Sequence, residues 1–263
     1  GVQIARSEIN VEGLLAINSG VVRETIPGLP AADPTFGLPA VWIKPQEKDR
    51  AQLAGYTVVD PTTVIATHLS EVIKSHVHEL LGRQETKGLL DHLAETHPKL
   101  IEETVPKILS LGEVQKVLQN LLKERLSIRD LTTILENLAD FGTLTKDTDL
   151  LSEYVRQGIS RSICKTVQND KDEILVYTLS PDLEQNIAKG LTHTDKGVFL
   201  FLDPKTMDEI VRKIHSSLQD GVARSRAVLL TSANVRLHLK RLTERLLPNL
   251  VVLSHNEIPP NVK

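Results

Sequence analysis

The segment most similar to a metal-binding motif is His78-Glu79-Leu80-Leu81-Gly82. Zinc proteases carry HExxH on a helix, because two histidines one turn apart bind the metal and the glutamate activates water. Gly82 stands where the second histidine would be. His68 and His76 would share a helix face, but a metal site needs a third ligand. We therefore expect no metal and interpret these histidines as solvated or capping residues.

Other reactive side chains form no recognisable catalytic set. Cys164 has basic neighbours that would lower a thiol pKa, but the sequence assigns it no histidine partner, so we expect a buried structural cysteine. Adjacent carboxylates such as Glu102 and Glu103 point about 100° apart on a helix and do not converge. The chain has no GxxxxGKS/T phosphate loop, no GxGxxG and no GxSxG elbow. We expect neither an enzyme nor a cofactor.

Composition excludes further classes of protein. The 263 residues include 31 Lys+Arg against 34 Asp+Glu, a net charge of -3, and only 3% are aromatic. Nucleic-acid binding, including an RNA-binding αβ module, is disfavoured because basic surface and stacking platforms are lacking. No stretch reaches the roughly 18 apolar residues of a membrane span. The start at Gly1, without methionine or a signal pattern, is typical of a piece of a longer protein.

Periodicity indicates strands first and helices next. Alternating or continuous apolar residues predict strands, whereas the proline-rich stretch 27–39 predicts a loop that wraps over a sheet. Asp60-Pro61 predicts a helix start, because aspartate caps and proline loses no bond in the first turn. The predicted strands are Gly1–Ile9, Leu14–Ile17, Val41–Ile43 and Tyr56–Val59, and the predicted helical segments are 61–80, 85–93, 100–104 and 114–122.

The second half alternates helices and strands. Ser127-Ile128-Arg129-Asp130 predicts a capping-box start for a helix that ends at Gly142. A strand, helix and strand over 227–253 predict a small parallel βαβ unit. The fold class is therefore mixed α/β (α+β), with small α/β subdomains around a helical middle part. Further helices are expected at 149–166, 180–189, 203–220 and 234–246, and strands at 173–178, 198–202, 227–231 and 250–253.

Several segments together resemble the cytoplasmic domain of the flagellar type III export-gate (FlhA, FHIPEP) family. They occur in the family's order and span nearly the whole chain. The match favours the flagellar branch over the related virulence-secretion proteins. The segments are Asp33–Ile43, Gly55–Asp60 with Ala66–Leu69, Glu79–Glu85, Val117–Leu122, Ser127–Asp130, Leu250–Ser254 and Asn256–Ile258.

The resemblance implies four subdomains. The first would be discontinuous, with residues 1–56 and 106–126, and would lack its N-terminal part. A small second subdomain, 57–105, would be inserted into it. A helical-rich third would cover 127–205, and a compact βαβ-type fourth would cover 206–263. Pro and Gly placement between these parts predicts hinges near 55–60, 105–113 and 203–206.

The resemblance also implies a function. The intact protein would carry membrane spans, and this part would lie at the cytoplasmic face of the bacterial inner membrane. It would form a nine-membered ring, bind flagellar export chaperones with their cargo, and order and switch export. Its other partners would be the export ATPase complex and the substrate-specificity switch protein. The alternatives are a homologous virulence export-gate domain, or an enzyme or nucleotide-dependent switch with an unrecognised site.

The resemblance implies a chaperone-docking groove between the first two subdomains. Leu81 aligns with a bulky apolar groove residue that is often phenylalanine in relatives. His78 stands where relatives carry an acidic residue, and Gly112 where they usually carry threonine. The alternative for Leu80 and Leu81 is that they are plain core leucines. The predicted groove residues are His78, Leu80, Leu81, Gly82, Val105, Ile108, Leu111 and Gly112.

Overall fold

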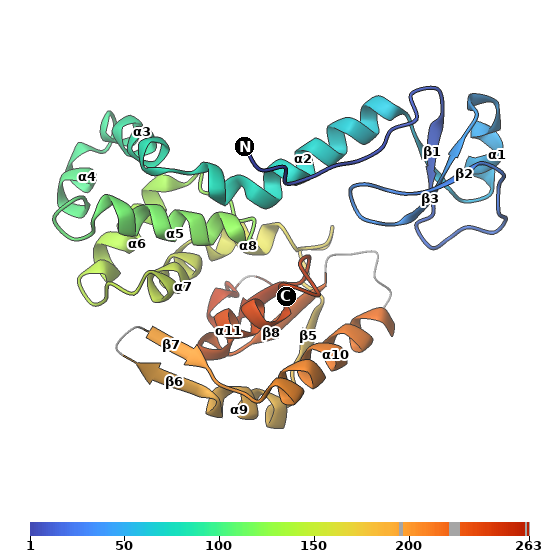
Figure 1. The fold of residues 1–263 in the computed structure, drawn as a ribbon. Coiled ribbons are helices and arrows are strands. Elements are labelled where there is room, and N and C mark those ends of the chain that lie inside the picture. The colour runs from blue at the N-terminus through green and yellow to red at the C-terminus, as the bar shows by residue number, and fades with distance from the viewer. Residues whose placement is uncertain (195–196, 221–226, 261, 263) are drawn as a thin grey trace. The chain divides into compact units, whose positions relative to one another are not determined.

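Two units make up the chain in the computed structural model, Gly1–Leu80 and Leu81–Lys263 (Figure 1). The structure describes residues 1–194, 197–220, 227–260 and 262. The boundary follows Leu80, so it coincides with none of the hinges predicted at 55–60, 105–113 and 203–206. The four predicted subdomain ranges stay a prediction.

An antiparallel sheet forms the centre of the first unit. Its strand order is β2-β3-β1-β4, and the elements around it are two short helices and one long one. Leu15 of β1 pairs with Trp42 of β3, which also pairs with Leu29 of β2. The elements are β1 (Leu14–Ile17), β2 (Leu29–Ala32), β3 (Pro39–Ile43), η1 (Pro45–Glu47), α1 (Lys48–Leu53), β4 (Thr57–Val59) and α2 (Pro61–Leu80).

Both faces of this sheet are covered. Ala16 and Ile43 pack with Ala51 of α1 in one apolar cluster, whereas Leu15 and Trp42 pack with Val64 of α2 in another. Neighbouring residues on a strand point to opposite faces, which is why Leu15 and Ala16 belong to different clusters. Only the first turns of α2 cover the sheet, because Val64 is the one buried residue of this helix.

Helices form the first half of the second unit. Caps fix where three of them begin: Ser110 and Glu113 make a capping box, Asp130 accepts from Thr133 N, and Asp147 accepts from Asp149 N. Leu118, Leu135 and other buried leucines, isoleucines and valines make their common core. The helices are α3 (Arg83–Ala94), α4 (Pro98–Thr104), α5 (Leu111–Lys123), α6 (Leu131–Gly142), α7 (Thr148–Gly158) and α8 (Ser160–Lys165).

A parallel three-stranded sheet, in the order β5-β8-β9, follows these helices. Val228 and Leu253 face the helical core, whereas Leu229 and Val252 face a second core made with α9, α10 and α11. Both faces are therefore covered at β8 and β9, as is usual for parallel sheets, whereas the edge strand β5 is exposed. The elements are β5 (Val176–Thr178), α9 (Pro181–Lys189), β6 (Leu191–Thr194), β7 (Gly197–Leu200), α10 (Pro204–Asp220), β8 (Val228–Thr231), α11 (Ala233–Thr243), β9 (Val251–Ser254) and η2 (His255–Glu257).

Most predicted elements are confirmed. The mixed α/β fold class, the strand Leu14–Ile17, the helix starts at Pro61, Pro181 and Pro204, and the parallel unit β8-α11-β9 are all present. Four details of the prediction are wrong. Residues 1–9 form no strand, and Val2 is exposed, because no other strand pairs with them. The helix expected over 149–166 is two helices, α7 and α8.

The other two errors concern local chemistry. The helix after residue 127 is capped by Asp130 rather than by Ser127. The proline-rich stretch contains β2, in which Pro30 pairs with Val41. Proline is tolerated there because β2 is an edge strand, which needs backbone partners on one side only.

Candidate docking surfaces

Leu81 is a core residue of the second unit. Its side chain is 7% exposed and packs in the cluster that contains Leu90 and Leu109. Its carbonyl oxygen accepts hydrogen bonds from Gln115 Nε2 and Gln119 Nε2, both at 2.9 Å. Two amides on α5 therefore fix the backbone just before α3 begins, and the burial of the Leu81 side chain agrees with the alternative that it is a core leucine.

The other predicted groove residues fall on both sides of the unit boundary. His78 and Leu80 end α2 in the first unit, where Leu80 is 63% exposed and His78 is half-buried. Val105, Ile108 and Leu111 are half-buried and pack against the helical core of the second unit. These three side chains are therefore partly exposed while they pack against that core.

Gly82 and Gly112 lie in the second unit, and each leaves room for a neighbouring polar side chain. A Cβ atom at Gly112 would lie 3.2 Å from Arg83 Nη2, and one at Gly82 would lie 2.6 Å from Glu85 Oε2. A threonine at position 112 would therefore require Arg83 to move.

An apolar cavity of about 660 Å³ lies along α2 in the first unit. Ile65, Leu69 and Ile73 are four residues apart, so they form one stripe on the helix, and all three are exposed. Residues of the N-terminal stretch 2–9 complete the lining. His68 and His76 also line this cavity, and His76 Nδ1 lies 3.0 Å from the Val72 carbonyl oxygen. Within the described residues, no group of His, Cys, Asp and Glu has a metal-binding arrangement.

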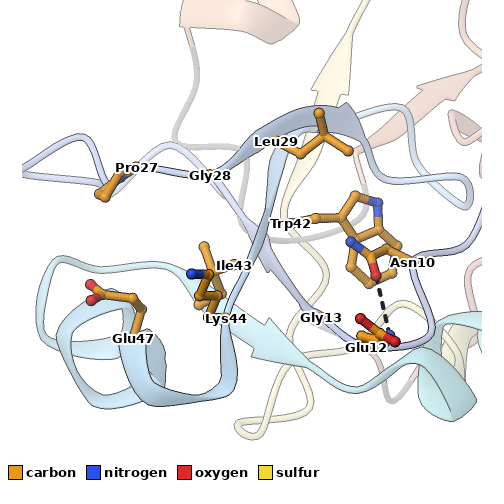
Figure 2. A pocket seen from close by; sticks show the side chains of 10 residues that line it. All are labelled: Asn10, Glu12, Gly13, Pro27, Gly28, Leu29, Trp42, Ile43, Lys44 and Glu47. Atoms are coloured by element: carbon orange, nitrogen blue, oxygen red, sulfur yellow. Dashed lines mark hydrogen bonds between the residues drawn. The ribbon is translucent and has the colours of Figure 1, made fainter.

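A second cavity, of about 570 Å³, lies where the ends of three strands meet (Figure 2). Gly13 precedes β1, Gly28 precedes β2, and Lys44 follows β3. A Cβ atom at Gly28 would lie 2.4 Å from the Trp42 carbonyl oxygen, so only glycine permits this approach of the strands. Glu12, Lys44 and Glu47 line the cavity, and these mixed charges favour neither a cation nor an anion. This cavity is not apparent in the sequence, because its residues come from separate strand ends.

A smaller cavity of about 170 Å³ belongs to the second unit. Tyr177 and Leu183 from β5 and α9 line it on one side, and Ile214 and Leu218 from α10 on the other. Its lining is mainly apolar, and among the described residues that line it Lys213 is the charged one.

A buried charge cluster is the main electrostatic feature of the second unit. Arg236 of α11 is fully buried and contacts both Glu124 and Glu153. Burial alone would raise the pKa of Glu124, but the guanidinium groups of Arg156 and Arg236 lower it to about 2. Burial raises the pKa of Glu153, against the attraction of Arg236.

Sequence analysis missed this cluster. Its signal was two cations, Arg236 and Lys240, one turn apart on α11 and directly beside the apolar positions Val235 and Leu239. Burial of a cation requires a partner, but spacing cannot name carboxylates more than 80 residues away.

Cys164 is expected to be inert in the folded protein. Its side chain is 1% exposed, and its Sγ donates to the Glu257 carbonyl oxygen at 3.1 Å. Burial, helped by the Glu257 charge, raises the pKa of the thiol to about 11. At pH 8 we expect labelling by a thiol-disulfide reagent to be at least about 100-fold slower than in denaturant. Equal labelling rates in the two conditions would contradict this placement.

Among the residues that the structure describes, no helix has both the length and the apolar character of a membrane crossing.

Comparison with known proteins gives one consistent family. The FHIPEP family matches residues 1–263. The chain is 45% identical over 264 residues to "Flagellar biosynthesis protein FlhA" of Bacillus subtilis, covering 100% of this chain and 39% of that protein. It is 39% identical over 262 residues to the FlhA of Escherichia coli, covering 99% of this chain and 37% of that protein. The chain thus spans less than two fifths of the length of these relatives.

Solved structures agree with the sequence match. The Chlamydia pneumoniae CdsV protein has a TM-score of 0.82 and 29% identity, covering 98% of this chain and 74% of that one. The nonameric EPEC SctV-C structure has a TM-score of 0.78 and 25% identity, and the match covers 96% of this chain and 76% of that one. The CdsV and CdsO complex from Chlamydia pneumoniae has a TM-score of 0.76 and 30% identity, and the match covers 85% of this chain and 66% of that one. By sequence and by fold, this chain belongs to the FHIPEP family.

Proposed function

We propose that this chain is the cytoplasmic docking platform of a flagellar type III protein export gate. It binds export chaperones with their cargo and helps to order and switch export. The observation that carries the proposal is the similarity to FlhA proteins over residues 1–263. In this role the chain is a receptor rather than an enzyme and uses no cofactor.

The identities support the flagellar branch over a virulence export gate. Curated FlhA relatives are 34–45% identical to this chain. The solved structures named above and the EscV cytosolic domain from a type III secretion system are 25–30% identical.

The solved relatives also support assembly. Two of them are nonameric, and one is a complex of CdsV with CdsO. By analogy, the intact protein forms a nine-membered ring at the cytoplasmic face of the inner membrane. There it contacts the export ATPase complex and the substrate-specificity switch protein.

We assign chaperone contacts separately in each unit. Leu80 offers exposed apolar surface at the end of α2. Val105, Ile108 and Leu111 offer half-buried apolar surface in the second unit. Apolar side chains of this kind bind an amphipathic partner helix. Leu81 would support this surface from the core rather than contact the partner.

The test is a calorimetric titration of the chain with a flagellar export chaperone, alone and bound to its cargo. Leu80→Asp removes exposed apolar surface, and Leu53→Asp is the matched control, because Leu53 is 85% exposed on α1 of the same unit. We expect Leu80→Asp to weaken binding roughly tenfold to 100-fold, the range for one leucine desolvated by a partner. Leu53→Asp should bind as the wild type does.

Each outcome decides a different claim. Wild-type affinity in a folded Leu80→Asp variant would remove Leu80 from the docking surface. Failure of the wild type to bind the chaperone in either form would contradict the docking function. A nucleotide that raises the melting temperature would instead support a nucleotide-dependent switch.

A further inference from the structure

Six charged side chains meet in the second unit; four of them are buried, and Glu124 and Glu153 keep 16% and 14% of their side-chain surface exposed. They come from the C-terminal end of α5, from α7, from α11 and from η2, so they join the helical half to the α/β half. Arg236 is 0% exposed, Glu257 1%, Arg156 2% and Lys240 8%. The cluster consists of three carboxylates and three cations, Glu124, Glu153, Glu257, Arg156, Arg236 and Lys240.

Arg236 connects α11 to two helices. Its Nη1 donates to Glu124 Oε2 at 2.8 Å, and its Nη2 donates to Glu124 Oε1 at 3.0 Å. Its Nε donates to Glu153 Oε2 at 2.5 Å, and its Nη2 also contacts Glu153 Oε1. Both carboxylates are therefore bound by two nitrogens of the planar guanidinium, a geometry that lysine cannot reproduce.

Arg156 makes the second connection. Its Nη1 donates to Glu124 Oε2 at 2.9 Å, and its Nη2 lies 2.6 Å from Glu257 Oε1. The same Nη2 donates to the Val252 carbonyl oxygen of β9 at 3.3 Å. Glu257 Oε2 in turn accepts from Ser254 N at 2.6 Å and Ser254 Oγ at 2.8 Å. Glu124 is thus shared by both arginines.

This cluster lies between elements of two apolar cores. Leu118 and Val155 pack in the core that the helices share with Val228 and Leu253 of the sheet, whereas Leu239 and Val252 pack in the second core. Apolar surfaces tolerate sliding, but a small displacement here would leave a buried charge without its partner. An unpaired buried charge is strongly destabilising, whereas a matched set favours one specific arrangement. A partly displaced cluster therefore has a higher free energy than either the intact cluster or a cluster whose charges are all hydrated.

We propose that the charge cluster is a latch, which holds the helical half (α3–α8) and the α/β half (β5–η2) in one arrangement. Movement between the halves occurs only in one step, when water enters and all the pairs separate. This inference concerns coupling inside the chain and does not depend on the proposed docking function.

Hydrogen exchange with mass spectrometry on the full chain tests the latch. The readout is the ratio of exchange rates between the slowest peptides of α11–β9 and those of α5–α7. In the wild type we expect a ratio near one, because the halves open together. In Arg236→Gln we expect the α/β peptides to exchange about 100-fold faster than the helical ones, as they lose the link to Glu124 and Glu153.

The matched control is Arg241→Gln on the same helix, because Arg241 makes an exposed pair with Asp149 at 2.7 Å. It should leave the ratio unchanged. If Arg236→Gln does not fold, the same ratio is measured in Glu124→Gln, which retains the side-chain shape. A ratio well above one in the wild type, or equal acceleration of both halves in the folded variant, would overturn the latch.

Discussion

Replacing Leu81 with aspartate is expected to unfold the second unit rather than only to weaken docking. Truncation of a buried leucine to alanine costs about 2–5 kcal/mol, and a buried unpaired carboxylate costs more. Leu81 is 7% exposed in the helical core, so this loss is comparable to the whole stability of an ordinary domain. Urea unfolding followed by circular dichroism measures the change.

The neighbouring residue provides the control for this experiment. Leu80 is 63% exposed, and an exposed substitution usually changes the free energy of unfolding by about 0.5 kcal/mol or less. Leu80→Asp should therefore unfold at nearly the wild-type urea concentration. If Leu81→Asp keeps the wild-type midpoint and loses chaperone binding, Leu81 is a contact residue rather than a core residue.

Glu124→Gln is expected to lower the free energy of unfolding at pH 7 by roughly 3–5 kcal/mol. The substitution removes one charge from a buried set and leaves Arg156 and Arg236 short of a carboxylate. The wild type should also lose stability in acid. The pKa of Glu124 is about 2 in the folded protein, below its ordinary value of 4.5, so the unfolded chain binds the proton first as the pH falls.

The sign and the range of this pH effect follow directly. The stabilisation from Glu124 is fully present above about pH 5 and disappears as the pH falls towards about 2, and it amounts to about 3 kcal/mol. Urea unfolding of both proteins at several pH values from 7 to 3 isolates this contribution as the difference between two curves. Parallel curves would show that Glu124 is not held ionised by the arginines.

Local chemistry made much of the fold predictable from the sequence. Asp60-Pro61 and Ser180-Pro181 mark helix starts, because each supplies a cap and a residue that loses no bond in the first turn. The spacing of Val114, Val117, Leu118 and Leu121 predicts the buried face of α5. These signals act within a few residues of each other, so tertiary context rarely reverses them.

The errors arise where contacts with residues far away in the sequence determine the local structure. Residues 1–9 alternate like a strand but have no pairing partner in the structure, whereas Leu29–Ala32 looks like a loop and pairs with β3. The sequence does not show that Leu81 is buried and Leu80 exposed, for the same reason. Both are leucines at a helix end, but Leu81 packs in the cluster that contains Leu90 and Leu109, and Gln115 and Gln119 bind its carbonyl oxygen.

The order in which residues leave the ribosome matters for the charge cluster. Glu124 and Glu153 are made 112 and 83 residues before Arg236, which contacts both of them. Before α11 is synthesised, Arg156 is the cation available to these two carboxylates. The nascent helices therefore carry an excess negative charge, which cannot be buried without a partner. We therefore expect a chain that ends shortly before Arg236 to leave α5 and α7 hydrated and accessible to proteases, because their carboxylates lack this partner.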